Sequence, residues 1–179
     1  MARSQLATIG GGCFWCLEAI YQRLNGVTKV TSGYSGGDFP NPSAYDVYAG
    51  KTGHAEVVQI EFDPKVVSFR QILEIFYVMH DPTTLNRQGN DVGEEYRSVI
   101  FYYDAGQKAE AEDVINNFAR QLWAKPIVTE IKPFKKFWPA AREHQNFYNN
   151  NRQAGYCQII IEPKIAKLRH EFANKLRPL

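Results

Sequence analysis

Apolar and polar positions divide the first half of the chain into alternating strand and helix segments. The short apolar run LATIG (6–10) predicts a strand, and the stretch 13–24 repeats its apolar residues with the period of a helix until an Asn-Gly pair ends it. Segments 27–34 and 55–62 alternate as strands do. The residues between these two strands are too rich in Gly and Pro for regular structure, and a loop of this length is usually functional.

The second half continues with the same kinds of segment. Residues 68–82 predict a helix that a proline ends, and a polar loop covers residues 83–95. The remaining elements are, in order, a strand over 96–103, a helix over 105–123, a strand over 127–131, a helix around 139–150, a turn at 152–157 and an amphipathic C-terminal helix carrying Ile165, Leu168, Phe172 and Leu176.

The order of these segments defines a fold class. Strand, helix, strand, strand, helix and strand, followed by more helix, is the split β-α-β arrangement. We therefore expect an α+β fold: a two-layer sandwich with a ferredoxin-like βαββαβ core, long functional loops and a C-terminal helical extension. A chain of 179 residues with 44% apolar and 22% charged residues suits one domain over residues 1–179. Within it, the Asn- and Gly-rich segment around 149–160 is expected to be mobile.

The charge pattern and the cysteine count narrow the partners and the compartment. The net charge is only +2, and the longest basic run is the pair Lys135-Lys136, which argues against nucleic acid as a partner. The N-terminus enters a strand-like run at once, and we expect neither a signal peptide nor a membrane span. Three cysteines, an odd number, suit reactive thiols that the cell keeps reduced. These features predict a cytoplasmic protein, and we also expect a monomer.

The stretch GGGCFWC (10–16) contains the first candidate for chemistry. Cys13 falls at the predicted first turn of a helix, where free N–H groups and the helix dipole stabilise an anion and lower a thiol pKa. A thiolate nucleophile is one interpretation, and a small buried apolar residue is the other. Three glycines, which let backbone amides approach a bound group, and two aromatic neighbours favour the nucleophile.

Cys16 lies three residues further on and suggests either a redox C-x-x-C pair or half of a metal site. The chain has no second C-x-x-C pair, and its four histidines lack the spacing of zinc ligands. We therefore expect no metal.

A second candidate is Glu56, in the segment TGHAEVVQIEF (52–62). Strand alternation places it on the same side as Val58, Ile60 and Phe62. A carboxyl group in apolar surroundings has a raised pKa and can serve as a general acid near neutral pH. Alternation alone is equally consistent with a carboxylate at a frayed strand end in water.

The motifs GCFWC, GYSGG, TGHAEVV, HDPT, NRQGNDVGEEYRS and GYC occur in this order along the chain. With them the sequence closely resembles the peptide methionine-S-sulfoxide reductase (MsrA) family, from about Gly11 to Cys157. The combination of GCFW, TGHAE and RQGND is far more specific than any one motif. The resemblance implies an enzyme that repairs oxidised methionine, in proteins and as the free amino acid, without a bound cofactor. Its implied reductant is thioredoxin, or dithiothreitol in vitro.

The resemblance also assigns roles to the two candidates. The cysteine of GCFW, here Cys13, attacks the sulfoxide sulfur and releases methionine, which leaves a sulfenic acid on the enzyme. A sulfoxide oxygen is a poor leaving group unless it is protonated, and the glutamate of TGHAE, here Glu56, is the implied acid. The residues that resemble the family's substrate-binding groups are Phe14 and Trp15 for the methyl group and Asp91 and Tyr96 for the sulfoxide oxygen.

One departure from the family concerns a tyrosine that donates its hydroxyl to the sulfoxide oxygen. The family usually has N-P-T-Y, and this chain has NPSAYDVY, so that the tyrosine falls on Ala44 when counted without gaps. Tyr45 could take its place through a small shift of the loop, Tyr48 or a water molecule could substitute, or the hydrogen bond could be lost. We expect Tyr45.

The resolution of the sulfenic acid involves a choice between two thiols. On a regular helix, side chains three residues apart have Cβ atoms ~5 to 6 Å apart, whereas a disulfide needs ~3.5 to 4.5 Å. A bond from Cys13 to Cys16 would therefore strain the first turn. Cys157 lies in the mobile segment and matches the family's resolving cysteine in G-Y-C. We expect Cys157 to attack, thioredoxin to reduce the resulting disulfide, and Cys16 to be a packed thiol or a secondary partner.

Two other functions are compatible with parts of the sequence. A thioredoxin-like dithiol oxidoreductase also places C-x-x-C at a helix start, but it needs no TGHAE acid; it would reduce insulin disulfides and would not turn over methionine sulfoxide. A thiol or metal-binding module without enzymatic activity is the more distant alternative, and it requires stoichiometric bound metal in the purified protein.

Overall fold

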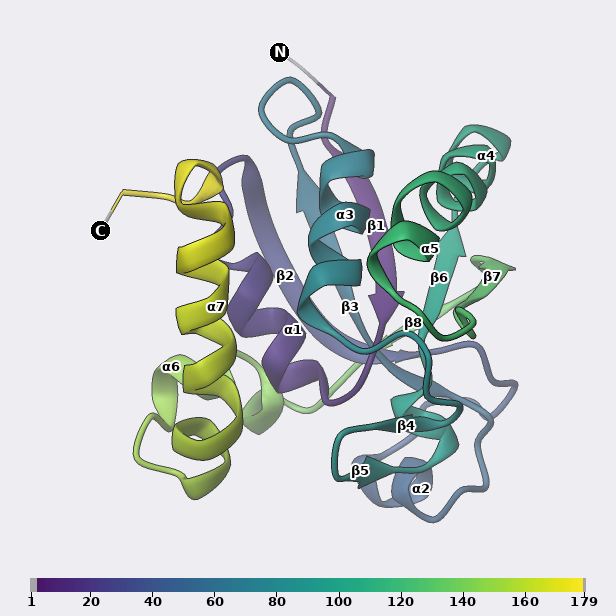
Figure 1. Cartoon of the computed structure of the whole chain (residues 1–179). Coiled ribbons are helices and arrows are strands. Elements are labelled where there is room, and N and C mark those ends of the chain that lie inside the picture. The colour runs from purple at the N-terminus through teal and green to yellow at the C-terminus, as the bar shows by residue number, and fades with distance from the viewer. Residues whose placement is uncertain (1–2, 179) are drawn as a thin grey trace.

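The computed structural model describes residues 3–178 and is built around one curled six-stranded sheet with the strand order β7-β6-β1-β3-β2-β8 (Figure 1). Neighbouring strands are antiparallel except β6 and β7, which run parallel. The strands are β1 (Gln5–Gly10), β2 (Val27–Ser35), β3 (Ala55–Phe62), β6 (Val99–Tyr102), β7 (Glu130–Pro133) and β8 (Phe137–Pro139). A separate small hairpin pairs β4 (Arg87–Gln88) with β5 (Asp91–Val92).

Helices cover the sheet, and in Figure 1 α1, α3 and α7 lie side by side in front of it. The helices are α1 (Phe14–Tyr21), α2 (Ala44–Tyr48), α3 (Phe69–Met79), α4 (Ala105–Val114), α5 (Arg120–Leu122), α6 (Phe147–Asn150) and α7 (Glu162–Phe172). One π-helical turn joins α4 to α5, and another, Cys157–Ile161, leads into α7. The result is a mixed α/β fold. None of the helices within residues 3–178 is long and apolar enough to cross a membrane.

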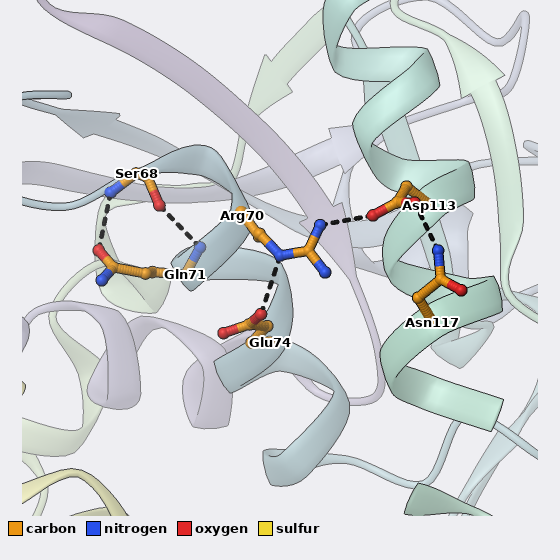
Figure 2. A network of polar contacts seen from close by, with 6 residues as sticks. All are labelled: Ser68, Arg70, Gln71, Glu74, Asp113 and Asn117. Atoms are coloured by element: carbon orange, nitrogen blue, oxygen red, sulfur yellow. Dashed lines mark hydrogen bonds and ion pairs between the residues drawn. The ribbon is translucent and has the colours of Figure 1, made fainter. Parts of the chain in front are cut away.

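Helix α3 shows how local sequence and packing agree. Its apolar face is buried in the core, where Phe76 has no exposed surface and Met79, at the helix end, is 4% exposed. Ser68 and Gln71 form a capping box: the Ser68 hydroxyl oxygen accepts the Gln71 N–H at 3.1 Å, and the Gln71 side-chain oxygen accepts the Ser68 N–H at 3.0 Å (Figure 2). The pattern S-x-x-Q before an apolar run therefore explains where this helix begins.

An ion-pair network connects α3 to α4 on the outside of the same helix. The Arg70 guanidinium lies 3.1 Å from Glu74 in the next turn and 2.6 Å from Asp113 on α4 (Figure 2). All three side chains are about a third to a half exposed, and such pairs contribute little to stability. The network therefore links α3 to α4 at the protein surface.

The structure confirms the strands predicted over 6–10, 27–34 and 55–62 and moves the one predicted over 127–131 to β7. The helix predicted around 139–150 is wrong: only a 3-10 turn, Arg142–His144, and α6 form there. Two observations explain the interruption. Asn146 adopts a left-handed conformation with φ of 54°, and the side chain of Gln145 bonds to the backbone of β2. Tertiary contacts with β2 replace the helix.

Candidate functional site

Cys13 is the N-cap residue of α1, directly after the glycines that follow β1. Its backbone is extended, with φ of −64° and ψ of 130°, and its side chain is 9% exposed. The predicted sequence of strand, glycine turn, cysteine and helix is confirmed.

The glycines of this turn serve close packing within the protein. A Cβ at Gly11 would lie 2.7 Å from the His80 ring, and a Cβ at Gly10 would lie 2.6 Å from the backbone oxygen of Glu56. Gly12 has a φ of 90°, which L residues rarely adopt, and its N–H donates to the carbonyl of Tyr96 at 3.1 Å. The turn therefore brings Cys13 against the strand that carries Glu56, without a ligand being needed to explain the glycines.

Glu56 lies on β3, opposite Tyr34 of β2 in the strand register, and has no exposed surface. Its Oε1 accepts the backbone N–H of Phe14 at 3.1 Å, so the carboxyl group lies at the start of α1 next to Cys13. Its Oε2 is buried and has no hydrogen-bond partner among residues 3–178. Of the two environments that the alternation left open, the structure shows the buried one, and the alternative of a solvated strand end is wrong.

Burial raises the pKa of Glu56 to about 8. The N–H of Phe14 lowers this pKa, whereas the charges of Glu95 and Asp91 raise it further. Glu56 therefore carries a proton at neutral pH, in a position to donate it from the unpaired oxygen.

The two neighbouring thiols differ in a way that the sequence did not indicate. Burial raises the pKa of Cys13 well above its usual value, and the hydrogen bond with Cys16 and the charge of Glu56 raise it further. The same hydrogen bond lowers the pKa of Cys16 to about 7, against the effect of burial and with help from Lys164. The raised pKa of Cys13 differs from the lowered pKa expected of a thiol at a helix start, because desolvation outweighs the helix start, whereas the pKa of Cys16 is lowered.

Aromatic rings surround the start of α1. Phe14 has no exposed surface, and its ring centroid lies 5.6 Å from that of Tyr34. Trp15 is partly buried and stacks on Phe147, with centroids 3.6 Å apart and planes 5° apart, while Tyr156 meets its edge at 5.6 Å. Sequence reasoning missed Phe147 entirely, whereas Tyr156 had a signal, its place before the cysteine of G-Y-C.

The expectation for Tyr45 is wrong. Helix α2 directs this side chain outward, where it is 81% exposed. Tyr48, one turn later, is half-exposed; burial raises its pKa, and the next contributions come from Glu56, Tyr96 and Cys13. Burial likewise raises the pKa of Tyr96, followed by the charges of Glu56 and Cys13. The structure therefore brings Tyr48 and Tyr96, and not Tyr45, to the acid and the thiol.

A cleft of about 570 Å³ lies on the other side of Cys13 and Cys16. In it the Tyr156 hydroxyl donates to Asp91 Oδ2 at 2.9 Å and lies 3.6 Å from the Cys16 sulfur. Cys157, the next residue, has no exposed surface, and burial and the charge of Cys16 raise its pKa. Cys16 therefore influences the pKa of both other thiols, Cys13 and Cys157.

Two buried thiols three residues apart at the start of a helix, next to a buried carboxyl group with a raised pKa, are typical of one class of protein: a cysteine-dependent oxidoreductase. Within residues 3–178, no group of three or more His, Cys, Asp and Glu side chains is arranged to hold a metal ion. The family model described as peptide methionine sulfoxide reductase matches residues 5–176. The chain belongs to the peptide methionine sulfoxide reductase family.

Comparisons with individual proteins support this family membership. The chain is 50% identical over 173 residues to the peptide methionine sulfoxide reductase MsrA of Saccharolobus solfataricus, covering 97% of each chain. Its structure is similar to that of reduced Mxr1 from Saccharomyces cerevisiae, with a TM-score of 0.79, 33% identity and 87% and 90% of the two chains covered. It is also similar to Mxr1 in complex with Trx2, with a TM-score of 0.56, 25% identity and coverage of 81% and 85%.

Proposed function

We propose that this enzyme reduces methionine-S-sulfoxide to methionine, in proteins and as the free amino acid, with Cys13 as nucleophile and Glu56 as acid. One observation carries the proposal: Glu56 accepts the N–H of the residue after Cys13 at 3.1 Å and keeps its other oxygen buried and unpaired beside the thiol. A carboxyl group with a pKa of about 8 has the proton that a sulfoxide oxygen needs in order to leave.

The atoms and electrons of the first step balance between these two side chains. The Cys13 sulfur attacks the sulfoxide sulfur, and the oxygen passes to Cys13, which becomes a sulfenic acid; the sulfur–oxygen bond of the substrate breaks, and its electron pair stays on the methionine sulfur. Glu56 gives its proton to the oxygen and receives the proton that leaves the Cys13 thiol. Because the raised pKa of Cys13 keeps that proton on the resting enzyme, its transfer accompanies attack.

The surrounding side chains hold the substrate. The hydroxyls of Tyr48 and Tyr96 bind the sulfoxide oxygen, and Tyr48 supplies the donor that Ala44 cannot. Asp91 assists from the cleft side, where it already binds a hydroxyl. The rings of Phe14 and Trp15 enclose the methyl group, which orients the small chiral centre for attack.

The thiols react in the order Cys13, Cys16, Cys157. The strain argument against Cys16 assumed a regular helix, but Cys13 precedes the helix with an extended backbone and already shares a hydrogen bond with Cys16. Cys16 attacks the sulfenic acid, forming a disulfide and releasing water. Cys157 then attacks Cys16, freeing Cys13, and this exchange requires movement of the segment around 149–160.

Thioredoxin or a similar dithiol then reduces the disulfide between Cys16 and Cys157. The likeness to Mxr1, a protein whose structure is known in complex with Trx2, supports this reductant. No bound cofactor takes part in this scheme. Three free thiols support a reducing, cytoplasmic location, and the enzyme acts as a single-domain monomer. The strand order β6-β1-β3-β2 with α1 and α3 supports the finer description of the core as ferredoxin-like.

The decisive experiment is turnover of each sulfoxide epimer of a blocked methionine with dithiothreitol. Wild-type protein should reduce only the S epimer, and Cys13→Ser should lose this activity with an unchanged circular dichroism spectrum. Substantial turnover by Cys13→Ser would refute the assignment of the nucleophile.

The order of the thiols is tested by one equivalent of substrate without reductant, followed by peptide mapping. Cys157→Ser should accumulate a disulfide between Cys13 and Cys16. Cys16→Ser should accumulate sulfenic acid or react slowly. If Cys16→Ser forms a direct Cys13 to Cys157 disulfide as fast as wild type consumes its sulfenic acid, the order first expected from the sequence is correct and the proposed order is refuted.

A further inference from the structure

Glu18 is a buried carboxylate that the proposed reaction does not use. It lies on α1, two residues after Cys16, and is 1% exposed. Its Oε2 accepts the hydroxyl of Ser32 on β2 at 2.7 Å. Burial raises the pKa of Glu18, and the Ser32 hydroxyl and the backbone N–H groups of Asn146 and Phe147 lower it in part. Glu18 therefore bonds α1 to Ser32 of β2, and Ser32 in turn bonds to Gln145, just before α6.

The segment that Glu18 holds is fixed a second time from β2. The Gln145 side-chain oxygen accepts the Ser32 N–H at 2.9 Å, and its amide N–H donates to the Ser32 carbonyl at 2.8 Å. Asn146 then takes the left-handed conformation that turns the chain into α6. Buried polar groups that are this fully bonded specify one backbone position.

This segment carries the rings that pack on Trp15. Phe147 stacks on the indole at 3.6 Å, nearly parallel, and His144 lies 5.8 Å from it, also stacked. Trp15 is only partly buried by the rest of the core, so these two rings determine the plane of its indole.

We propose that Glu18 is a positioning residue for the substrate: it holds segment 144–147 so that Phe147 keeps the Trp15 ring in the orientation that receives the methyl group. The proposal rests on the proposed function, in which Trp15 contacts substrate. It also separates two parts of the C-terminal region. The anchor ends at Phe147, before the segment around 149–160 that must move, so the methyl pocket keeps its shape while the thiols exchange.

The test is Glu18→Gln, compared with Tyr21→Phe as the matched control. Glutamine keeps the shape of the side chain but replaces one acceptor oxygen by a donor, which faces N–H or O–H groups that also donate. Tyr21 is on the same helix, has no exposed surface and donates to Ile72 on α3 at 2.8 Å, away from segment 144–147. Glu18→Gln should raise KM for a methionine sulfoxide peptide by roughly two- to tenfold, the range for one aromatic contact. Its single-turnover rate at saturating substrate should stay near that of wild type, and Tyr21→Phe should leave KM unchanged.

A second measurement does not depend on turnover. In protein labelled with 5-fluorotryptophan, the Trp15 ¹⁹F resonance, assigned with Trp123→Phe and Trp138→Phe, should shift in Glu18→Gln and not in Tyr21→Phe. If Glu18→Gln does not fold, Phe147→Leu provides the same two measurements directly.

The outcomes separate the positioning role from the proposed reaction. An unchanged KM together with an unshifted Trp15 resonance would overturn the role of Glu18, because a lowered melting temperature alone indicates a structural residue. If the Trp15 resonance shifts in Glu18→Gln but the wild-type protein does not reduce methionine sulfoxide, Glu18 still positions Trp15 and the proposed function is rejected.

Discussion

Replacing Glu56 by glutamine should make the protein more stable as well as inactive, and the gain should depend on pH. The pKa of Glu56 is about 8 in the folded protein and 4.5 is its ordinary value. The folded protein therefore binds this proton more tightly than the unfolded chain does. The resulting contribution to stability is complete below the unfolded value and is lost as the pH rises from there through the folded value.

The difference between these two pKa values corresponds to about 5 kcal/mol, at roughly 1.4 kcal/mol for each pH unit. Most of the pH range between these two pKa values lies below neutrality. Between about pH 5 and about pH 7 the wild-type protein should lose about 3 kcal/mol of unfolding free energy through this one group. Glutamine does not titrate, so the unfolding free energy of Glu56→Gln should rise relative to wild type by the same amount.

The assay is unfolding in guanidinium chloride at several pH values across this window, with dithiothreitol to keep the thiols reduced. The control is Glu61→Gln on the same strand, whose side chain is half-buried and belongs to the opposite face. The control and wild type should give parallel plots of unfolding free energy against pH. Equal slopes for Glu56→Gln and wild type would show that Glu56 is not protonated in the folded protein, and its role as acid would be lost with that result.

Further predictions concern the substrate-binding side chains and the rate. Tyr48→Phe should lower kcat/KM by roughly tenfold, the effect of one hydrogen bond to a reacting oxygen, while Tyr45→Phe should leave it unchanged; the reverse result would return the role to Tyr45. Trp15→Ala should raise KM while single-turnover chemistry persists, and an unchanged kcat/KM would make Trp15 a core residue only. The single-turnover rate of wild type should fall as the pH rises through about 8, because only protonated Glu56 donates, and a flat profile to higher pH would contradict this. Glu56→Asp should retain more of that rate than Glu56→Gln, which has no proton to give; equal rates in stopped-flow would contradict it.

The features of the site that the sequence predicted are those that depend on residues close together along the chain. A strand, three glycines and an apolar helical pattern were enough to place Cys13 at a helix start, and the alternation of β3 placed Glu56 on the same side as Val58, Ile60 and Phe62, although it did not decide whether Glu56 is buried. Both inferences rest on periods of two or 3.6 residues, which a single segment shows by itself.

The parts that sequence missed depend on contacts between distant segments. The short helix α2 determines which tyrosine of NPSAYDVY faces the acid. A capping box between Ser43 and Asp46 sets the start of α2, which lies in a segment that the sequence predicted to be an irregular loop. The pKa of Cys13 depends on how completely other elements enclose it, and no pattern near Cys13 carries that information. The break in the helix predicted around 139–150 depends on Gln145 and its partners on β2.

The burial of Met79 has a consequence for the working life of the enzyme. Met79 is the one methionine within residues 3–178, and only 4% of its side chain meets solvent. Peroxides and hypochlorite oxidise methionines that they can reach, and within residues 3–178 the conditions that generate substrate find almost no exposed methionine. Cys13, Cys16 and Cys157 are also buried. The enzyme therefore needs little of its own activity to repair itself, and its activity toward other proteins should persist as the concentration of oxidant increases.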